Sequence, residues 1–293
     1  MQKSPQIALI GFGEAGKAFT QGWLSKQSCD IRAFDIKTLE VETRDKKYNE
    51  YQKYNVRGLD ALKKVVLGEE FIFSLVTANK ASAAAVSAAQ YIQPKQYYFD
   101  CNSCSPNTKK ANAEIIEKMG GYYIDVAVMS PVDLKLHKTP ILISGTRDQE
   151  ALAILNSLGM DVSVISGGVG QASVIKMIRS IMVKGLEALN AECLLAARKA
   201  GVESILFDSL SSIFPEYEEK STYMLERMIQ HGERRAEEMK EVSLTLNELR
   251  LPHELTDASV KWHQQIGEMA LATDEHKFNN FADAILHKIK CKN

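Results

Sequence analysis

The fold of this chain is decided by the stretch IALIGFGEAGKAF, from Ile7 to Phe19. Its four apolar residues Ile7 to Ile10 have the length and composition of a strand that is buried on both faces. Gly11, Gly13 and Gly16 follow in the pattern G-x-G-x-x-G. The first glycine of this pattern permits a tight turn, the second lets a pyrophosphate approach the backbone, and the third lets a helix pack closely on the strand.

The context of the glycines favours a dinucleotide site, because free N–H groups at the start of the following helix would meet phosphates. Asp30–Phe34 is a predicted second strand, and Asp35 stands at its end, nineteen residues after Gly16. A dinucleotide fold places a carboxylate there that accepts hydrogen bonds from the adenosine ribose. A glycine-rich turn in some other α/β protein stays open as the alternative.

A carboxylate at position 35 would repel a 2'-phosphate, so the sequence favours NAD over NADP as the cofactor. Lys37 and Arg32 lie close by in the sequence and are the cations that could meet a 2'-phosphate instead. The predicted cofactor-binding residues are Gly11, Phe12, Gly13, Glu14, Ala15, Gly16, Asp35, Val76 and Thr77.

Composition narrows the class of protein. The 293 residues are 45% hydrophobic, which is ample for a sizeable core. Thirty-six basic residues balance thirty-seven acidic ones without a basic block, so we expect neither nucleic acid nor a membrane surface as partner. The start MQKSPQ lacks a signal-peptide pattern, no apolar segment reaches membrane-spanning length, and the five cysteines are scattered. These features predict a cytoplasmic protein.

Strands and helices alternate as far as Ile165, which predicts a Rossmann-type α/β domain with a doubly wound parallel sheet. The predicted strands are Ile7–Ile10, Asp30–Phe34, Phe71–Val76, Tyr97–Asp100, Tyr122–Val128, Pro140–Ser144 and Met160–Ile165, and the predicted helices include Thr38–Tyr54, Leu59–Leu67, Asn79–Ile92, Asn107–Met119 and Asp148–Leu158.

The pattern changes at residues 166–170, after which we predict no strand and Gln171–Ala200 forms one long helix. We therefore predict a dinucleotide-binding domain over residues 1–166 and an all-α domain for substrate binding and dimerisation over 167–293. Apolar residues at three- and four-residue steps from Leu225 to Leu249 indicate a second long helix with a bend at Gly232. His253–Leu271 and Phe278–Lys290 are further predicted helices.

Lys176 is the first candidate for chemistry, one and a half turns into a helix that opens from a glycine loop. The helix dipole and burial would both lower the pKa of this amine, which could then exchange a proton with a substrate hydroxyl. The alternative, a surface lysine near a helix start, is slightly favoured by the local sequence alone.

Four segments together, IALIGFGEAG, DCNSCSP, DVAVMSP and GGVGQASVIK, resemble the β-hydroxyacid dehydrogenase family, which includes the 3-hydroxyisobutyrate and 6-phosphogluconate dehydrogenases. The resemblance covers nearly the whole chain and implies that Lys176 is the catalytic acid/base. It also implies that Asn102 and Ser103 bind substrate and that the all-α domain builds a homodimer.

The sequence departs from the family pattern where substrate would bind. The substrate loop ends in Met129-Ser130-Pro131 in place of a glycine pair, and Ser180 stands where the family usually carries an asparagine. Ser130 and Ser180 are nevertheless expected to contact substrate through their hydroxyls. These departures resemble a branch of short phosphogluconate-dehydrogenase-like proteins whose second domain has a pattern like HGERRAEEM, residues 231–239.

Arg234 and Arg235 in that segment could hold a substrate carboxylate or phosphate in a bidentate way. The surrounding glutamates also fit a solvated face of mixed charge, and both interpretations stay open. Cys101 and Cys104 form a lone C-x-x-C, and no histidine spacing predicts a metal site.

The sequence thus predicts an NAD-dependent dehydrogenase of a small polar 3-hydroxy acid, with decarboxylation as an open second step. An imine or ketone reductase on the same fold should not need Lys176, and a non-catalytic dinucleotide-sensing protein need not keep it. Both remain alternatives.

Overall fold

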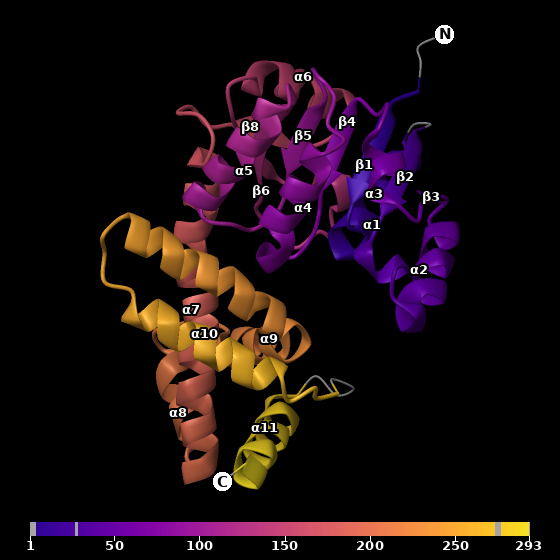
Figure 1. The fold of residues 1–293 in the computed structure, drawn as a ribbon. Helices are drawn as coiled ribbons and strands as arrows, with labels where there is room; N and C mark the ends of the chain where they lie inside the picture. Colours follow the sequence, from indigo (N-terminus) through magenta and orange to yellow (C-terminus); the bar gives the residue numbers. More distant parts are fainter. Residues whose placement is uncertain (1–3, 27–28, 273–276, 293) are drawn as a thin grey trace. The chain divides into compact units, whose positions relative to one another are not determined.

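The computed structural model describes residues 4–26, 29–272 and 277–292, and the chain divides into two compact units, Met1–Met177 and Ile178–Asn293. The first unit contains a sheet covered by helices, and the described part of the second unit is helical (Figure 1). Helix α7 (Gln171–Ala200) begins in the first unit and continues in the second.

The first unit is built on one eight-stranded sheet with the order β3-β2-β1-β4-β5-β6-β7-β8. Strands β1 to β6 are parallel, which confirms the predicted Rossmann-type α/β fold. The strands are β1 (Gln6–Ile10), β2 (Asp30–Phe34), β3 (Arg57–Gly58), β4 (Phe71–Ser74), β5 (Tyr97–Asp100), β6 (Tyr122–Val128), β7 (Ile141–Ser144) and β8 (Val162–Val164).

The prediction of a wholly parallel sheet was wrong at β7, which runs antiparallel to β6. Residues 129–140 connect these strands and contain only the short 3-10 helix η3 (Leu136–Lys138). A parallel pair needs a longer crossover, usually an α-helix, and this connection has none. Strand β8 pairs parallel with β7 and so shares its reversed direction.

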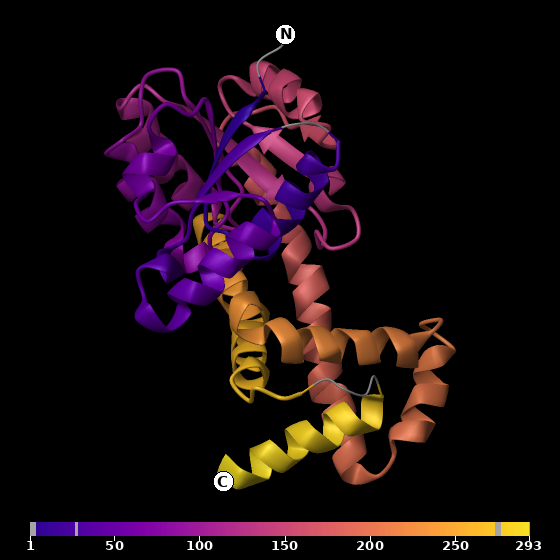
Figure 2. The same cartoon turned by 90° about the vertical axis from the view of Figure 1, so that its right-hand side faces the viewer.

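Helices cover both faces of the sheet because successive residues of each strand point to opposite sides (Figure 2). On β1, Ile7 and Leu9 join a core with α1 and α6, whereas Ala8 and Ile10 join a core with α3, α4 and α5. The helices are α1 (Glu14–Leu24), α2 (Val41–Lys53), α3 (Leu62–Val66), α4 (Ala81–Ala89), α5 (Pro106–Lys118) and α6 (Asp148–Ser157), with short 3-10 helices η1 (Ile36–Thr38) and η2 (Ala78–Lys80).

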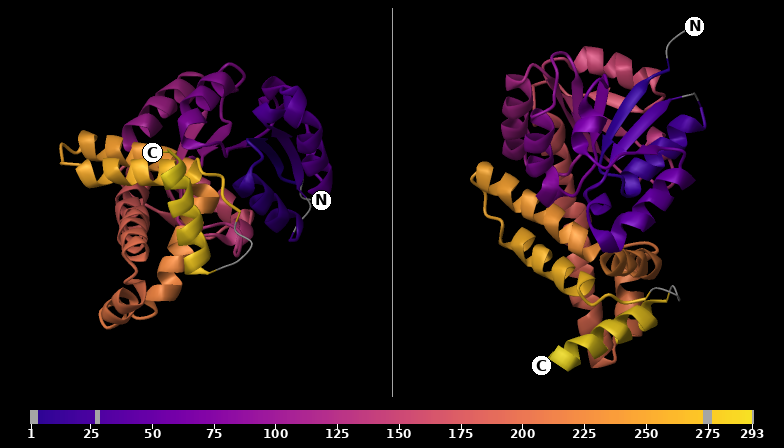
Figure 3. Two further views of the ribbon diagram at one scale, coloured as in Figure 1. Left: turned by 90° about the horizontal axis from the view of Figure 1, so that it is seen from below. Right: turned by 45° about the vertical axis from the view of Figure 1, so that its right-hand side comes forward.

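The second unit consists of the larger part of α7 and of α8 (Glu203–Ser211), α9 (Tyr217–Glu248), α10 (Glu254–Gly267) and α11 (Phe278–Lys292) (Figure 3). Helix α8 was not predicted from the sequence. The core of this unit includes Leu194, Leu225, Met228 and Ile266. Within the described residues, no helix is long and apolar enough to cross a membrane.

Two glycines let α9 and α10 pack closely. A Cβ atom at Gly232 would lie 2.4 Å from the carbonyl oxygen of His263 and 2.7 Å from Cα of Gly267. A Cβ at Gly267 would in turn lie 2.4 Å from the backbone nitrogen of Glu233. Helix α9 continues through Gly232, where the missing side chain makes room for α10.

We predict that Gly232→Ala lowers the free energy of unfolding by roughly 1–3 kcal/mol, because the added methyl group meets backbone atoms that cannot rotate away. Glu233→Ala is the matched control, since it also places alanine on α9 but at an exposed position. Urea denaturation of both variants measures the difference. Equal stability of the two variants would contradict the close packing.

Candidate active site

The candidate residues of the first unit lie at one edge of the sheet. Strands β1, β2, β4, β5 and β6 are parallel, so their carboxyl ends meet at the same edge, where open α/β sheets bind ligands. The residues that follow these ends are the glycine turn, Asp35, Val76 and Thr77, Asn102 and Ser103, and Ser130.

The glycine turn has the geometry that a close phosphate requires. Gly11 has φ +91°, and a Cβ there would lie 2.6 Å from the carbonyl oxygen of Leu75. A Cβ at Gly16 would lie 3.0 Å from the carbonyl oxygen of Gly11, so this glycine lets α1 pack against the turn. Gly13 is exposed at the N-cap of α1, and apart from its two chain neighbours no described residue has an atom within 4 Å of where its Cβ would be. These residues therefore fit a dinucleotide pyrophosphate at the helix start.

Asp35 has a carboxylate whose orientation is fixed by backbone groups. Its Oδ2 accepts a hydrogen bond from the N–H of Phe12 at 2.9 Å, and its Oδ1 accepts one from the N–H of Lys37 at 3.1 Å. Each oxygen keeps acceptor capacity for a further donor, as a ribose hydroxyl would supply. The Phe12 side chain points away into the core, where its ring lies 5.1 Å from that of Tyr51.

Lys47 is a buried cation beside Asp35 that the sequence did not single out. Its Nζ lies 3.6 Å from Oδ2 of Asp35 and donates to the carbonyl oxygen of Phe12 at 2.9 Å. Glu50 accepts from Lys47 at 2.6 Å and pairs with Lys17 at 2.8 Å. Lys47 thus ties α2 to the glycine turn and partly offsets the charge of Asp35.

Arg32 was named as a cation that could meet a 2'-phosphate, and this stays a prediction. Its guanidinium pairs at 2.7 Å with Glu69, a carboxylate that is almost fully buried. Breaking this pair would leave a buried charge without compensation. Lys37, which is exposed, stays a candidate.

Asn102 connects the ends of β4 and β5. Its Oδ1 accepts from the N–H of Val76 at 2.7 Å, and its Nδ2 donates to Oγ of Ser74 at 2.9 Å and to Oδ1 of Asp100 at 2.7 Å. The side chain is buried, and these bonds use both amide hydrogens. Its visible contacts therefore position the loop after β4, and direct contact with substrate stays a prediction.

A row of polar residues crosses four neighbouring strands. Ser74, Asp100, Asp125 and Ser144 are register partners on β4, β5, β6 and β7, and all are buried. The Lys109 ammonium from α5 lies between the two carboxylates, 3.0 Å from Asp100 and 3.4 Å from Asp125. Burial opposes protonation of Lys109, but the two carboxylates outweigh it and raise its pKa.

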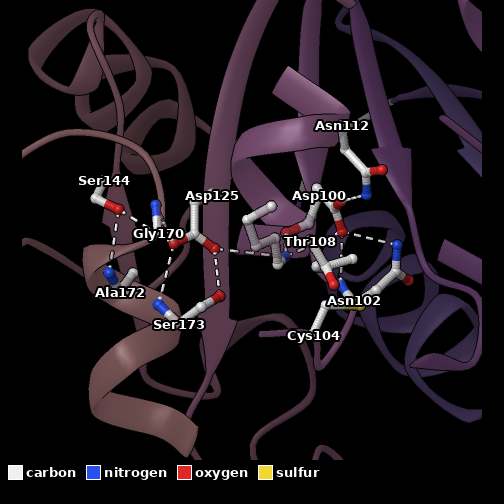
Figure 4. A network of polar contacts seen from close by, with 12 residues as sticks. Asp100, Asn102, Cys104, Thr108, Asn112, Asp125, Ser144, Gly170, Ala172 and Ser173 are labelled. Atoms are coloured by element: carbon white, nitrogen blue, oxygen red, sulfur yellow. Dashed lines mark hydrogen bonds and ion pairs between the residues drawn. The ribbon is translucent and has the colours of Figure 1, made fainter. Parts of the chain in front are cut away.

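Asp125 connects this row to the start of α7 (Figure 4). Its Oδ2 accepts from the N–H groups of Gly170 and Ser173 at 3.1 and 3.0 Å, and its Oδ1 accepts from the Ser173 hydroxyl at 2.6 Å. Ser144 donates to Asp125 at 3.2 Å and accepts from the N–H of Ala172 at 3.1 Å. The orphan N–H groups at the helix start therefore find partners on β6 and β7.

Lys176 lies three residues beyond Ser173 on α7 and is partly exposed. Its charge acts on Cys101, at the end of β5. Burial raises the pKa of the Cys101 thiol to about 12, although the charges of Lys109 and Lys176 lower it. The lysine thus lies near the carboxyl edge of the sheet, in the same unit as the glycine turn.

The C-x-x-C pair has no sign of redox chemistry. Cys101 and Cys104 are both buried and not joined in a disulfide, and a raised pKa keeps Cys101 protonated at neutral pH. Among the described residues, no group of three or more His, Cys, Asp or Glu side chains is arranged to hold a metal ion.

Ser103 and Ser130 are partly exposed at the same sheet edge, after β5 and β6. For neither hydroxyl does the described part of the chain supply a hydrogen-bond partner, so both are available to a ligand. Their contact with substrate stays a prediction.

In the second unit, α7 carries a polar row of Ser180, Lys184 and Glu187. Lys184 is buried, donates to the Ser180 hydroxyl at 3.1 Å and pairs with Glu238 of α9 at 2.8 Å. On α10, His263 is fully buried and hydrogen-bonds through Nε2 to the carbonyl oxygen of Lys184 at 3.1 Å. Apart from Ser180, the residues described in this paragraph were not predicted from the sequence.

Arg235 is 8% exposed and pairs with Glu187 at 3.1 Å, so a wholly solvated face of mixed charge does not describe this segment. Burial lowers the pKa of Arg235 and raises that of Glu187 to about 7, although Arg235 and Lys184 oppose the latter change. Arg234 is partly exposed and lies 3.9 Å from Glu238. Substrate contact by Arg234 and Arg235 stays a prediction.

Two family models match the chain. Residues 6–185 match the family described as the NAD binding domain of 6-phosphogluconate dehydrogenase, and residues 197–266 match a domain of unknown function, DUF1932. The first match covers more than half of the chain and includes Lys176.

Three solved structures show the extent of the similarity. A conserved hypothetical protein from Sinorhizobium meliloti is 30% identical, with 98% of this chain and 97% of that chain covered and a TM-score of 0.71. The conserved protein MTH1747, described as similar in structure to 3-hydroxyacid dehydrogenases, is 28% identical over 90% of this chain and 97% of its own, with a TM-score of 0.66. A 3-hydroxyisobutyrate dehydrogenase from Mycobacterium tuberculosis shares the fold at 13% identity, with 98% and 100% coverage and a TM-score of 0.71.

The buried cluster of the second unit predicts a pH dependence of stability with two opposing parts. Burial lowers the pKa of His263 to about 4, so as pH falls below about 6.5 the unfolded state takes up the proton first and stability falls. The raised pKa of Glu187 has the opposite effect on stability. Between about pH 7 and about pH 4.5 the folded state takes up the proton first, so stability rises as pH falls.

We therefore expect a nearly flat stability profile in the wild type between about pH 6.5 and about pH 5, because each group contributes a slope of about 1.4 kcal/mol per pH unit. In Glu187→Gln only the contribution of His263 remains, so stability should fall as pH falls. In His263→Gln only the contribution of Glu187 remains, so stability should rise as pH falls. Urea denaturation across this range measures both slopes. Slopes of the same sign in the two variants would contradict the assignment.

Proposed function

The chain belongs to the family of the NAD-binding domain of 6-phosphogluconate dehydrogenase, and on this basis we propose that it is an NAD-dependent dehydrogenase of a small polar 3-hydroxy acid. The family makes it a hydroxyacid-dehydrogenase-like oxidoreductase that binds a nicotinamide dinucleotide. The preference for NAD, the class of substrate and the residues that act on it are the proposal.

One observation carries the proposal: Lys176 lies in the same compact unit as the glycine turn, one turn beyond Ser173, which hydrogen-bonds to Asp125, the register partner of Asp100 at the carboxyl end of β5. An amine at this edge can reach a ligand that also touches the loops after β4 and β5.

Bound nicotinamide would supply the hydride acceptor for oxidation of the substrate carbon. Lys176 in its neutral form would accept the hydroxyl proton as the carbon–oxygen double bond forms. Ser103 and Ser130 would bind substrate oxygens from the sheet edge. In the second unit, Ser180 and the arginines Arg234 and Arg235 are the proposed groups for the acid function. A β-keto acid product could then lose carbon dioxide.

Turnover of the correct substrate tests this function. The panel should hold threonate, glycerate, 3-hydroxyisobutyrate, 6-phosphogluconate and L-serine, all 3-hydroxy acids, with NADH absorbance as the readout. Reduction of imines or ketones with no oxidation of any acid would favour the reductase. Binding of NAD without turnover of any compound would favour a dinucleotide sensor.

We predict that NAD binds at least about tenfold more tightly than NADP, a difference of about 1.4 kcal/mol. Asp35 is held by two backbone N–H groups with its remaining acceptor capacity available to a ribose, and its charge repels a 2'-phosphate. Asp35→Asn should bring the ratio of the NADP and NAD dissociation constants closer to one, as measured by fluorescence titration.

Asp30→Asn is the matched control, because Asp30 lies at the opposite end of the same strand. It should leave the ratio unchanged. Equal affinity of the wild type for both cofactors would reject the assignment of Asp35.

We predict that Lys176→Ala lowers kcat on the true substrate by roughly 10²- to 10⁴-fold, or about 3–5 kcal/mol of transition-state stabilisation. Lys176→Arg should recover little activity, because arginine stays protonated and cannot accept the hydroxyl proton. The dissociation constant of NAD should change little in both variants.

Lys110→Ala, which removes an exposed lysine of α5, controls for loss of charge. If Lys176→Ala kept more than about a tenth of wild-type turnover, the acid/base would have to be another group.

The proposed assembly is a homodimer formed through α7. Ile178, Met182, Leu186 and Leu189, here called the α7 stripe, recur at helical spacing and are all exposed in the single chain. A second copy of the chain would cover this stripe, as the family resemblance implies.

Light scattering should therefore give about twice the chain mass of 32.6 kDa. Met182→Glu should give a monomer, because Met182 is 63% exposed in the middle of the stripe. Leu255→Glu is the matched control, since Leu255 is 88% exposed on α10 and lies outside the stripe. A monomeric wild type at micromolar concentration would reject the dimer.

A further inference from the structure

We propose that Asp125 is a positioning residue for the Lys176 amine, because its carboxylate holds the start of α7 while the Lys109 ammonium compensates its charge. This inference rests on the proposed role of Lys176. It assigns to a buried carboxylate a part in the reaction that neither the motifs nor the comparisons indicate.

The start of α7 cannot supply its own cap. Gly167, Gly168 and Gly170 precede the helix and have no side chains that could accept its orphan N–H groups. Gly170 has φ +98°, and a Cβ there would lie 3.2 Å from atoms of Pro106, so a capping residue would not fit. The acceptor comes instead from Asp125, forty-five residues earlier in the chain.

A cap from a central strand fixes the helix more strictly than a local cap would. Asp125 lies on β6 in register with Asp100 and Ser144. Its three hydrogen bonds to Gly170 and Ser173 therefore set the height and rotation of the first turn relative to the sheet. A serine or asparagine at the N-cap would satisfy N–H groups but would move together with the helix.

The hydrogen bonds of Asp125 to the first turn of α7 determine the position of Lys176 through helix geometry. Residues three apart on a helix lie on the same face, so Lys176 stands one turn beyond Ser173. A rotation of the first turn would carry the amine away from the sheet edge. Because catalysis depends steeply on the placement of the reacting groups, even a small displacement should cost turnover.

The negative charge of the buried Asp125 carboxylate is compensated by the Lys109 ammonium. The side chains of Asp100, Lys109 and Asp125 are all 0% exposed, and an unpaired carboxylate there would be strongly unfavourable. The charged groups around the start of α7 are thus Asp125 on β6, Lys109 on α5, Asp100 at the end of β5 and Lys176 itself. The thiol of Cys101 also interacts with Lys176.

Two hydroxyl groups of the same network give a matched test. Ser173 donates to Asp125 at 2.6 Å, and Tyr123 donates to Asp100 at 2.6 Å. Both residues are 1% exposed, but only Ser173 lies on α7. Ser173→Ala and Tyr123→Phe therefore each remove one buried hydrogen bond from a hydroxyl to a carboxylate. Only Ser173→Ala removes a bond that α7 itself makes.

The first readout reports on Lys176 without any substrate. Lysines are reductively methylated with ¹³C, the Lys176 signal is identified by its loss in Lys176→Arg, and its pKa is measured by NMR titration. Asp125→Asn should lower this pKa by at least about half a unit, because a nearby negative charge is removed. Ser173→Ala should also shift the titration, whereas Tyr123→Phe should leave it as in the wild type.

The second readout is turnover. Ser173→Ala should lower kcat by about tenfold or more at an unchanged dissociation constant of NAD, and Tyr123→Phe should stay within about twofold of the wild type. An unchanged Lys176 titration in both Asp125→Asn and Ser173→Ala would overturn the proposal. So would an equal loss of kcat in Ser173→Ala and Tyr123→Phe, since that result would show a general effect of destabilisation.

Failure of the proposed function would look different. If the wild type oxidised no acid of the panel, the assigned reaction would fall, but the titration of Lys176 would still decide whether Asp125 positions it. If Asp125→Asn did not fold, Ser173→Ala would supply the same comparison with a milder change.

Discussion

The buried carboxylate of Asp125 is the constraint on which the rest of the first unit depends. A charge removed from water costs several kcal/mol unless it is paired and fully hydrogen-bonded, so each of its partners has to be in place. Those partners come from α5, β7 and the start of α7. One side chain therefore fixes the reversed strand, a covering helix and the helix that carries Lys176. The antiparallel pairing of β7 with β6 contributes directly, because it brings Ser144 opposite Asp125.

The two carboxylates that follow apolar strand runs, Asp35 and Asp125, differ in how far their acceptor capacity is used. Asp125 accepts four hydrogen bonds and has the Lys109 ammonium at 3.4 Å, so no room remains for a ligand. Asp35 accepts two backbone hydrogen bonds, with Lys47 at a longer distance. The same residue type thus has a structural role at position 125 and, as proposed, a role in cofactor recognition at position 35. The count of donors separates the two roles where burial does not.

The sequence predicted β2, β5, β6 and α7 with their observed bounds. Uninterrupted apolar runs and long periodic segments mark such elements well, because their burial is a local property. The direction of β7 was missed because strand patterns are the same for both directions. The lysines Lys47 and Lys109 were missed for a different reason: a lysine in a polar helix suggests an exposed position, and only carboxylates from distant strands make its burial possible.

A signal for the network was nevertheless present. The four strands β4 to β7 contain the segments FIFS, YYFD, YYID and ILIS, each with three apolar or aromatic residues before a polar one. Because neighbouring strands align in register, equivalent polar positions form a row, and a row with two carboxylates requires a buried cation. The compensating cation, Lys109, lies on α5, a helix that was predicted from the sequence without any indication of a buried lysine.

The proposed acid/base and the proposed substrate group Ser180 lie on the same helix, α7, but belong to different units. Lys176 belongs to the unit that holds the glycine turn, and its position follows from Asp125 and the sheet. Ser180, one turn later, already belongs to the second unit, where Lys184 orients its hydroxyl. The departures from the family pattern at Ser130 and Ser180 leave every contact of Asp125 intact. Residues 130 and 180 can therefore change while the position of Lys176 stays the same, because different contacts determine each.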